Sequence, residues 1–422
     1  MIRTFTGEIL SAPAALEIDM NTCNYDCVYC YAKSLDRPKY FNLKSIVSML
    51  RASQNGKRLI HRLIRTRYSI CVCNRTDPFS SVNIKSTIPM IDILLSNGAD
   101  PMYLTKGGAG IYDVLKLHEE NKKKAVFYFT VTTINPEIAR AIEPGAPPPE
   151  DRIAMIKDVI KAGHKVIVGI NPLLDAWMSK AEVMEFTDRV SALGVSGFWV
   201  AGLHFGRNMT SDYATRAISA AARYGHTGFG KRQFDKARQM HVQDCVEAMI
   251  AKGYVVHCSL MPYTDDIYDI YSSVHKIMPV KTTIINHLIR GGKDQLLYFD
   301  EYYKITVGDE HRDLFETEFS FNDIQQYLFI SGFRVSKQLD RSTVTLKGLL
   351  RFMWNVHDRM NKTPKDHILF LKCVDGGRPA LDSSGNRIVF FSPDNIKYNR
   401  AGKVVYDIRA GKRTQEGKEV IL

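Results

Sequence analysis

Two regular patterns of apolar and polar positions alternate along the first 260 residues. Short runs that are almost continuously apolar predict strands at 16–20, 69–74, 101–105, 125–131, 165–170, 197–203 and 254–259. Between them, apolar residues three or four positions apart predict amphipathic helices at 42–52, 84–95, 151–162 and 180–193. Buried strands that alternate with helices indicate a parallel sheet, and therefore an α/β fold. We expect a closed or partial (β/α) barrel whose chemistry lies in loops at the carboxyl ends of the strands.

The pattern changes after residue 261, where it is less regular and richer in tyrosine and charge. Ser320 and Asp323 have the spacing of a helix N-cap. Helical spacing of apolar residues follows, at Leu346, Leu349, Leu350, Met353 and Met360. The apolar runs RIVFF and KVVYDI then predict a β-hairpin or ribbon. We expect a barrel domain at 1–315 and a smaller C-terminal α+β module at 316–422, organised like a winged helix.

Composition narrows the class of protein. The chain has 422 residues, of which 45% are hydrophobic and 24% charged, as is typical of a soluble enzyme with a substantial core. It contains no apolar run long enough to span a membrane and no apolar signal-peptide segment at its start. Its eight cysteines do not form a disulfide framework. We therefore expect a cytoplasmic protein.

The net charge of +12 is concentrated near the C-terminus. Residues 331–422 hold 18 Lys or Arg but 9 Asp or Glu. A basic region of this kind attracts polyanions such as nucleic acid. It is equally consistent with a solvated surface that keeps the protein soluble, and charge alone leaves both open.

The segment CNYDCVYC places Cys23, Cys27 and Cys30 in a C-x3-C-x2-C triplet directly after the first predicted parallel strand. Three such thiolates can hold three irons of a [4Fe–4S] cluster, which ordinarily takes four cysteines. The fourth iron is then open, and can bind the amino and carboxylate groups of S-adenosylmethionine (SAM). The alternatives are a structural zinc site or three unrelated thiols. Zinc prefers four ligands in paired clusters, and the sequence offers no second pair.

This cysteine spacing, with Tyr29 before the last cysteine, resembles the radical SAM superfamily. Further segments resemble its spore photoproduct lyase-like group, often described as DNA repair photolyases. They occur in the family's order between about residues 16 and 174, and are CNRTDPF (Cys73–Phe79), YLTKG (Tyr103–Gly107), FTVTTINPE (Phe129–Glu137) and EPGAPPPEDR (Glu143–Arg152). The resemblance implies a partial (β/α) barrel of the radical SAM type. It also implies a [4Fe–4S] cluster and SAM as cofactors, with an electron donor such as a flavodoxin or ferredoxin.

Residue by residue, the resemblance implies that Cys23, Cys27 and Cys30 ligate the cluster. Tyr29 would lie beside the adenine of SAM. Lys106 would approach the SAM carboxylate or ribose, with Thr130 nearby as a hydroxyl partner. The alternatives are a barrel-lining lysine paired with an acid, and a threonine bonded to its own backbone.

Three further charged residues have open roles. Glu143 and Arg152 either contact SAM at the barrel mouth or form a structural ion pair around a proline-rich turn. Asp77, before Pro78, caps a helix or organises the loop after the second parallel strand.

Cys73 occupies a position resembling that of the family's hydrogen-atom donor, although its offset to the following aspartate is one residue longer. Cys71 is predicted on the same strand face, and Cys258 on a late strand is a rival donor. The alternative without a catalytic role is that Cys73 is a buried thiol that packs as a small apolar residue. Gly107-Gly108 is interpreted as a turn that opens the next helix.

The chemistry implied by the resemblance is abstraction of hydrogen from a C–H bond by a 5′-deoxyadenosyl radical. Our first hypothesis for the substrate is a DNA base, repaired or modified, bound through the basic C-terminal module by phosphate contacts and stacking. The residues for this are Phe390, Phe391, Lys397, Tyr398, Arg400, Lys403, Tyr406 and Arg409. The alternatives are a radical SAM enzyme acting on a peptide or small metabolite, and a non-catalytic iron–sulfur protein that binds nucleic acid.

Overall fold

The computed structural model describes residues 1–4, 12–30, 32, 41–203, 215–216, 218–220, 231–258, 267–293, 295–324, 343–356, 370–375, 378–391, 396–398, 404–406 and 419–421. The chain divides into two compact units, which we describe separately. The first comprises Met1–Thr4, Ala14–Gln54 and Leu63–Ile277, and the second comprises Phe5–Pro13, Asn55–Arg62 and Met278–Leu422. Among the described helices, none has the length and apolar character needed to cross a bilayer.

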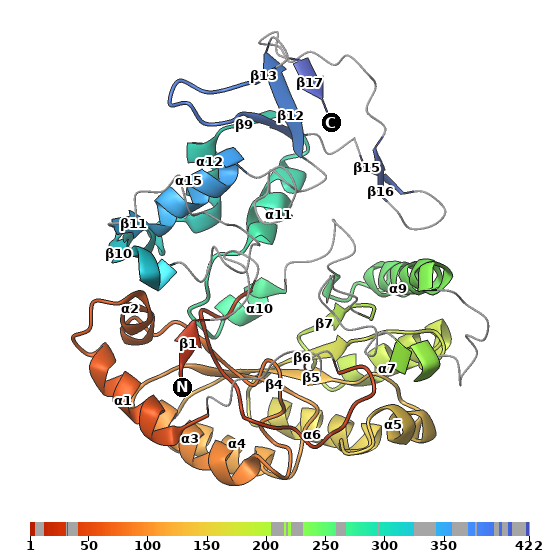
Figure 1. The fold of residues 1–422 in the computed structure, drawn as a ribbon. Helices are drawn as coiled ribbons and strands as arrows, with labels where there is room; N and C mark the ends of the chain where they lie inside the picture. The colour runs from red at the N-terminus through yellow and green to blue at the C-terminus, as the bar shows by residue number, and fades with distance from the viewer. Residues whose placement is uncertain are drawn as a thin grey trace. The chain divides into compact units, whose positions relative to one another are not determined.

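The first unit is built on one eight-stranded sheet whose strands follow one another in chain order (Figure 1). Its strands are β1 (Arg3–Thr4), β2 (Leu16–Ile18), β3 (Ile70–Val72), β4 (Pro101–Thr105), β5 (Val126–Thr130), β6 (Lys165–Ile170), β7 (Gly197–Val200) and β8 (Val256–His257). β1 is antiparallel to β2, and every later pair is parallel. The sheet runs from β1 to β8 without closing. The predicted α/β fold and partial barrel are confirmed.

Helices connect these strands, as the apolar periodicity predicts. They are α1 (Leu43–Ser53), α2 (Leu59–Arg65), α3 (Ile84–Ser96), α4 (Ile111–Glu120), α5 (Pro136–Ile142), α6 (Pro149–Lys161), α7 (Lys180–Ser191), α9 (Lys231–Ala251) and α10 (Tyr268–Ser272). Helices α1, α3, α4 and α6 line one side of the sheet in Figure 1. Local chemistry starts several of them: Ser179 and Glu182 form a capping box at α7, and Asn135 caps α5.

The two faces of the sheet carry different residues because side chains alternate along a strand. Phe129 lies beside Met155 of α6, next to Gly107, so its face is the one that the helices cover. The opposite face, which we call the inner face, therefore carries Thr130. Strand register aligns Thr130 with Gly169 on β6, Trp199 on β7 and His257 on β8. A polar and aromatic row thus crosses the inner face.

The second unit combines helices with antiparallel strands. Its elements are α11 (Lys281–Gly291), β9 (Gln295–Leu297), α12 (Phe299–Val307), α13 (Arg312–Glu316), β10 (Glu318–Ser320), β11 (Thr343–Thr345), α15 (Leu346–Val356), β12 (Phe370–Asp375), β13 (Arg378–Pro379), β14 (Val389–Phe391), β15 (Ile396–Tyr398), β16 (Val404–Tyr406) and β17 (Glu419–Ile421). Strands β13, β12, β14 and β9 form a sheet in that order, and β17 pairs with β12.

The C-terminal part of this unit begins at Met278, whereas the sequence predicted a domain boundary at 316. The reason is that segments before 316 pack within it: β9 pairs with β14, and Phe299 of α12 meets Trp354 of α15 edge to face at 6.1 Å. The predicted N-cap pair is present, since Ser320 Oγ donates to Asp323 Oδ2 at 2.8 Å.

The predicted ribbon is wrong in its pairing. β14, from RIVFF, pairs with β12 and β9, whereas β16, from KVVYDI, pairs with β15. β14 is taken into a larger sheet because its side chains are apolar and buried, and this sheet exceeds the small ribbon of the predicted winged helix. Met360 lies outside the described residues.

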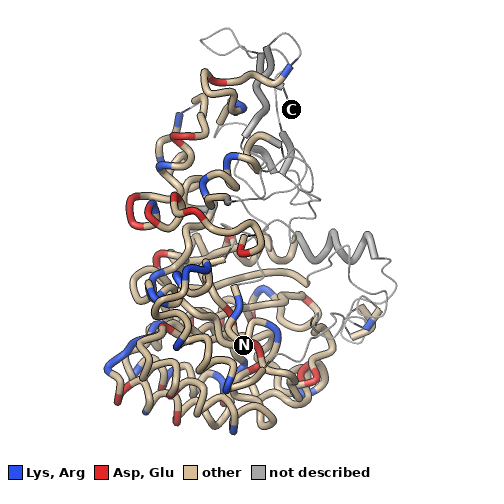
Figure 2. The backbone as a smooth tube through the Cα atoms, turned by 60° about the vertical axis from the view of Figure 1, so that its left-hand side comes forward, with Lys and Arg blue, Asp and Glu red and all other residues tan. Residues whose placement is uncertain are grey.

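Part of the predicted nucleic-acid-binding surface is wrong because two of its aromatic residues are buried. Phe390 is 8% exposed and Phe391 is fully buried, so neither can stack on a base. Lys397, Tyr398 and Tyr406 lie on β15 and β16, while the predicted Arg400, Lys403 and Arg409 lie outside the described residues. Along the described backbone, basic and acidic residues are interspersed (Figure 2).

Candidate active site

The cysteine loop leaves β2 at the carboxyl edge of the sheet and is held from two sides. On one side is the turn after α5: Val28 N–H donates to Ile142 O at 2.9 Å, and Gly145 N–H donates to Tyr25 O at 3.0 Å. A Cβ atom on Gly145 would lie 2.2 Å from Asn24 O, so the two segments approach closely only because this residue is glycine.

On the other side, the segment between β3 and α3 holds the same loop. Asn83 Nδ2 donates to Thr22 O at 2.8 Å, and Met20 N–H donates to Thr76 Oγ1 at 3.1 Å. Loops that follow β2, β3 and β5 are therefore joined around the cysteines, as expected for the carboxyl edge of a parallel sheet.

The three cysteines lie in an apolar environment within this loop. Cys27 is buried in one cluster with Tyr29 and Trp177, and the half-buried Cys23 and Cys30 pack against that cluster. Burial raises the pKa of Cys27 to about 12, although Lys106 acts in the opposite direction. Burial also raises the pKa of Cys23. A bound metal would convert such thiols to thiolates.

These thiols fit a three-cysteine iron–sulfur site in number, placement and chemistry. Among the described residues, no three His, Cys, Asp or Glu side chains converge as ligands of one metal ion. A zinc site would require that convergence. A four-iron cluster does not, because each cysteine binds a different iron. The donor set is therefore compatible with a cluster, and Cys23, Cys27 and Cys30 are the residues that would hold it.

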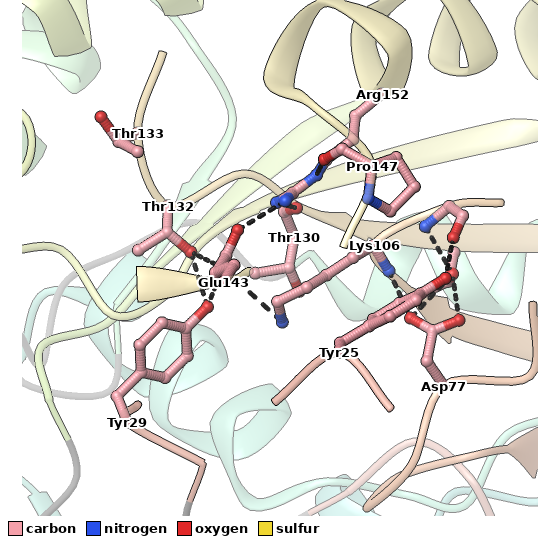
Figure 3. Close-up of polar contacts among 12 residues, drawn as sticks. Tyr25, Tyr29, Asp77, Lys106, Thr130, Thr132, Thr133, Glu143, Pro147 and Arg152 are labelled. Atoms are coloured by element: carbon pink, nitrogen blue, oxygen red, sulfur yellow. Dashed lines mark hydrogen bonds and ion pairs between the residues drawn. The ribbon is translucent and has the colours of Figure 1, made fainter. Parts of the chain in front are cut away.

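A buried polar network centred on Glu143 lies beside the cysteine loop (Figure 3). Arg152 Nη2 approaches Glu143 Oε2 at 2.5 Å, and Lys106 Nζ lies 4.0 Å from Oε1. Thr132 Oγ1 donates to Oε1 at 2.7 Å, and the Tyr29 hydroxyl donates to the same oxygen. Residues from the cysteine loop, β4, the β5 end and α6 thus meet on one carboxylate.

The network has one buried negative charge and two positive ones. Burial acts to raise the pKa of Glu143, but Arg152 and Lys106 outweigh it and hold that pKa below its usual value. Burial acts to lower the pKa of Lys106, but Cys27 and Glu143 raise it overall. Lys106 therefore stays protonated, with its Nζ 5.6 Å from the centre of the Tyr29 ring. An excess positive charge at the barrel mouth suits an anionic ligand.

Asp77 fixes the backbone that carries Lys106. Its carboxylate accepts hydrogen bonds from Lys106 N–H at 2.6 Å, from Phe79 N–H at 3.0 Å and from Thr105 Oγ1 at 2.9 Å. Burial raises the pKa of Asp77 to about 6. The prediction that Asp77 organises its loop is borne out by these contacts. Gly107 and Gly108, both with positive φ, form the predicted turn ahead of α4.

The structure brings most of the predicted site residues together. Tyr29, Lys106, Glu143 and Arg152 belong to one network, and Arg152 also donates to Pro147 O at 2.7 Å, so the predicted ion pair around the proline turn is present. Thr130 joins it through its backbone, since its carbonyl accepts from Arg152 Nη1 at 3.1 Å.

Sequence analysis missed Tyr25, Thr132 and Trp177. The Tyr25 hydroxyl donates to Gly107 O, which ties the cysteine loop to the end of β4. Thr132 is two residues after Thr130 in the run FTVTT, and that two-residue repeat was the only signal for its side chain. Trp177 carried no signal, because its contact with the loop joins segments far apart in sequence.

Cys73 is 1% exposed and directly follows β3, in a left-handed backbone conformation with φ of 65°. Because the strand ends at Val72, the alternation that predicted a shared face with Cys71 does not extend to Cys73. Burial raises the pKa of Cys73, and Asp19 acts in the same direction. Cys71 and Cys258 are also buried. A donor role for Cys73 stays a prediction.

Comparison with known proteins places this geometry in context. No family model matches the chain. Uncharacterized proteins of Mycobacterium bovis and Mycobacterium tuberculosis are 24% identical over 191 residues, covering 43% of this chain. The chain matches about half the length of these curated relatives, 56% of each.

Among solved structures, spore photoproduct lyase with a dinucleoside spore photoproduct is 16% identical, covering 61% of this chain and 79% of that one at a TM-score of 0.42. Streptococcus suis SuiB with S-adenosylmethionine is 13% identical, covering 58% and 49% at 0.40. Escherichia coli coproporphyrinogen III oxidase (HemN) is 13% identical, covering 59% and 54% at 0.36. At these identities and TM-scores the likeness carries no argument, and the resemblance of this chain to the radical SAM superfamily stays a prediction from its cysteine motif.

Proposed function

We propose that this chain is a radical SAM enzyme that acts on a nucleic-acid base. The observation that carries the proposal is the cysteine triplet beside the Glu143 network at the carboxyl edge of a parallel sheet. A reduced [4Fe–4S] cluster supplies the electron that cleaves SAM to methionine and a 5′-deoxyadenosyl radical, which takes hydrogen from a C–H bond.

The residues around the cysteines have separate tasks in this proposal. Cys23, Cys27 and Cys30 bind the cluster. Lys106 provides a fixed positive charge for the SAM carboxylate, since its backbone is held by Asp77 and its ammonium group lies 4.0 Å from the Glu143 carboxylate. Tyr29 provides a ring beside the adenine, and Thr130 a nearby hydroxyl. Glu143 and Arg152 position Tyr29 and Lys106.

In this proposal the inner face receives a planar substrate. Trp199 is half-buried there, beside Gly169 of the neighbouring strand, whose missing side chain makes room for the Tyr128 ring. The Trp199 ring also lies 4.5 Å from His257, centre to centre. Aromatic surfaces of this kind stack on bases. The basic C-terminal module remains part of the proposal as the contact to DNA phosphates, and Cys73 as a candidate hydrogen donor to the product.

The first experiment is anaerobic reconstitution with iron and sulfide, followed by SAM and dithionite. We expect 5′-deoxyadenosine from the wild-type protein, none from Cys27→Ala, and more in the presence of DNA. Trp199→Ala should remove the DNA enhancement and leave the basal cleavage of SAM. A protein with an intact cluster that produces no deoxyadenosine would instead be a non-catalytic iron–sulfur protein. Production that DNA does not change would favour a peptide or small-metabolite substrate.

The role of Cys73 has its own test. Cys73→Ala should leave SAM cleavage intact and alter the product formed, because the substrate-derived radical would lack its hydrogen donor. Cys71→Ala is the matched control, a buried cysteine two residues earlier on β3. An unchanged product yield from Cys73→Ala excludes Cys73 as the essential donor.

A further inference from the structure

Trp177 is fixed against the cysteine loop by its own backbone. Its N–H donates to Leu174 O at 3.0 Å, and its carbonyl accepts from Thr133 Oγ1 at 2.6 Å. The indole ring is 1% exposed and lies 5.6 Å from the Tyr29 ring, centre to centre. It belongs to the same buried cluster as Cys27, and Cys23 and Cys30 pack against that cluster. The indole ring therefore lines the cysteine site.

Among the described residues, the buried indole Nε1–H of Trp177 has no hydrogen-bond partner. Native proteins rarely leave a buried donor unsatisfied. The Tyr29 hydroxyl, whose ring lies against the indole, is already bonded to Glu143 and Thr132. The surrounding cluster is otherwise made of apolar side chains and the cysteine thiols. The acceptor that this donor requires is best supplied by the group that the cysteines hold.

We propose that Trp177 Nε1–H donates a hydrogen bond to an anionic sulfur of the bound cluster, either a bridging sulfide or a cysteine thiolate. This inference rests on the proposed function, because it requires the cluster. Hydrogen bonds to cluster sulfurs help to set the reduction potential of iron–sulfur proteins. A donor withdraws electron density from sulfur and stabilises the reduced state, which carries one more negative charge. Trp177 is therefore a positioning and tuning residue that makes the cluster easier to reduce.

The test compares reduction potentials, measured by EPR-monitored titration without SAM. Trp177→Phe removes the N–H and keeps an aromatic ring. We expect about a tenfold less favourable reduction, which is about 59 mV for one electron. Trp354→Phe is the matched control: it also removes one of the three tryptophans, with an indole N–H that donates to Arg387 O in the second unit, and it should leave the potential unchanged. Potentials are compared at equal iron content per chain.

A second readout detects the bond itself. In the reduced cluster, electron–nuclear double resonance in H₂O and D₂O should show an exchangeable proton coupling that Trp177→Phe lacks and Trp354→Phe retains. Trp177→His keeps a ring N–H and should restore part of the potential. Trp177→Leu is a second variant without a donor, for use where Trp177→Phe does not fold.

The outcomes separate this inference from the proposed function. Unchanged potential and coupling in a donor-free variant that holds a full cluster would overturn the inference and leave the proposed function standing. A change that develops only after SAM is added would also overturn it, since the indole would then serve the ligand. A wild-type protein that assembles no cluster would contradict the proposed function itself.

Discussion

The two ends of the first unit's sheet both contain buried polar groups, but these groups are organised in opposite ways. At the carboxyl end, Glu143, Arg152 and Lys106 are charged and share partners. At the amino end lie three buried histidines, His118, His164 and His275. His118 and His164 meet edge to face with ring centres 5.1 Å apart.

The three histidines are bonded to their surroundings, and burial keeps His118 and His164 neutral. The Tyr103 hydroxyl lies 2.7 Å from His118 Nε2, and backbone N–H groups of Ala125 and Val126 donate to His164 and His275. Burial lowers the pKa of His118 to about 4 and that of His164 to about 3. These side chains complete the hydrogen bonding of strand ends and linkers.

The comparison teaches that burial of polar residues does not by itself mark a functional site. His118 and His164 are neutral, and the backbone N–H groups of Ala125 and Val126 find acceptors in His164 and His275, as a folded backbone needs. The carboxyl-end network instead holds an excess positive charge, and a buried indole N–H beside it has no partner within the part of the chain that the structure describes. Buried polar groups that lack a hydrogen-bond partner or a countercharge within the protein indicate a ligand site. Buried polar groups whose partners all lie within the protein indicate a role in stability.

The largest expected effect is at Glu143. Glu143→Gln keeps the side-chain shape but leaves Arg152 and Lys106 buried without a countercharge, which should cost about 3–5 kcal/mol of unfolding free energy in urea titration. The control is Glu150→Gln, an exposed carboxylate paired with Arg189, which should change stability by about 0.5 kcal/mol or less. Equal effects at the two positions would show that the network is not energetically distinct from the surface.

Gly145→Ala tests the close approach that holds the cysteine loop. The new Cβ would lie 2.2 Å from Asn24 O, so the loop must shift. We expect a loss of about 1–3 kcal/mol, together with reduced iron retention after reconstitution. Gly291→Ala is the control, since its Cβ would meet nothing within 4 Å. Full iron retention by Gly145→Ala would contradict the need for this contact.

Acidification tests the amino end. The pKa of His118 is lowered to about 4 in the folded state, below the ordinary value of 6.5, so protons bind preferentially to the unfolded chain. Stability is therefore lost as pH falls below 6.5, and the loss is complete below 4. Between pH 7 and pH 5, His118 accounts for about 2 kcal/mol of this loss. His118→Gln should reduce the difference by that amount, whereas the exposed His287→Gln should not.

The smallest effects come from deleting one hydroxyl at each end. Tyr25→Phe removes the bond to Gly107 O, and Tyr103→Phe removes the bond to His118 Nε2. Each should cost about 1 kcal/mol in chemical denaturation. The two should differ in iron retention, which Tyr25→Phe lowers and Tyr103→Phe leaves unchanged. Equal iron retention by the two variants would contradict the claim that only the carboxyl end of the sheet supports the cysteine loop.

The sequence by itself determined the parallel sheet and the position of the cysteines. Apolar runs such as 101–105 and 165–170 match β4 and β6 residue for residue, because strands buried on both faces need continuous apolar side chains. The motifs also placed Lys106 directly after a strand, at the edge where parallel topology brings distant loops together, and Glu143 and Arg152 on either side of a proline-rich turn.

Only the tertiary structure decided which side chains complete one another. Glu143 accepts hydrogen bonds from two hydroxyl groups, and β9 pairs with a strand of the second unit; both contacts join residues that are separated in the chain. Nothing in the sequence indicated that the indole N–H of Trp177 would be buried without a partner among the described residues. The pairing of β14 away from β16 has the same origin. Apolar periodicity specifies that a segment is buried, but it does not specify the partner, because that choice depends on packing and hydrogen bonding across the whole fold.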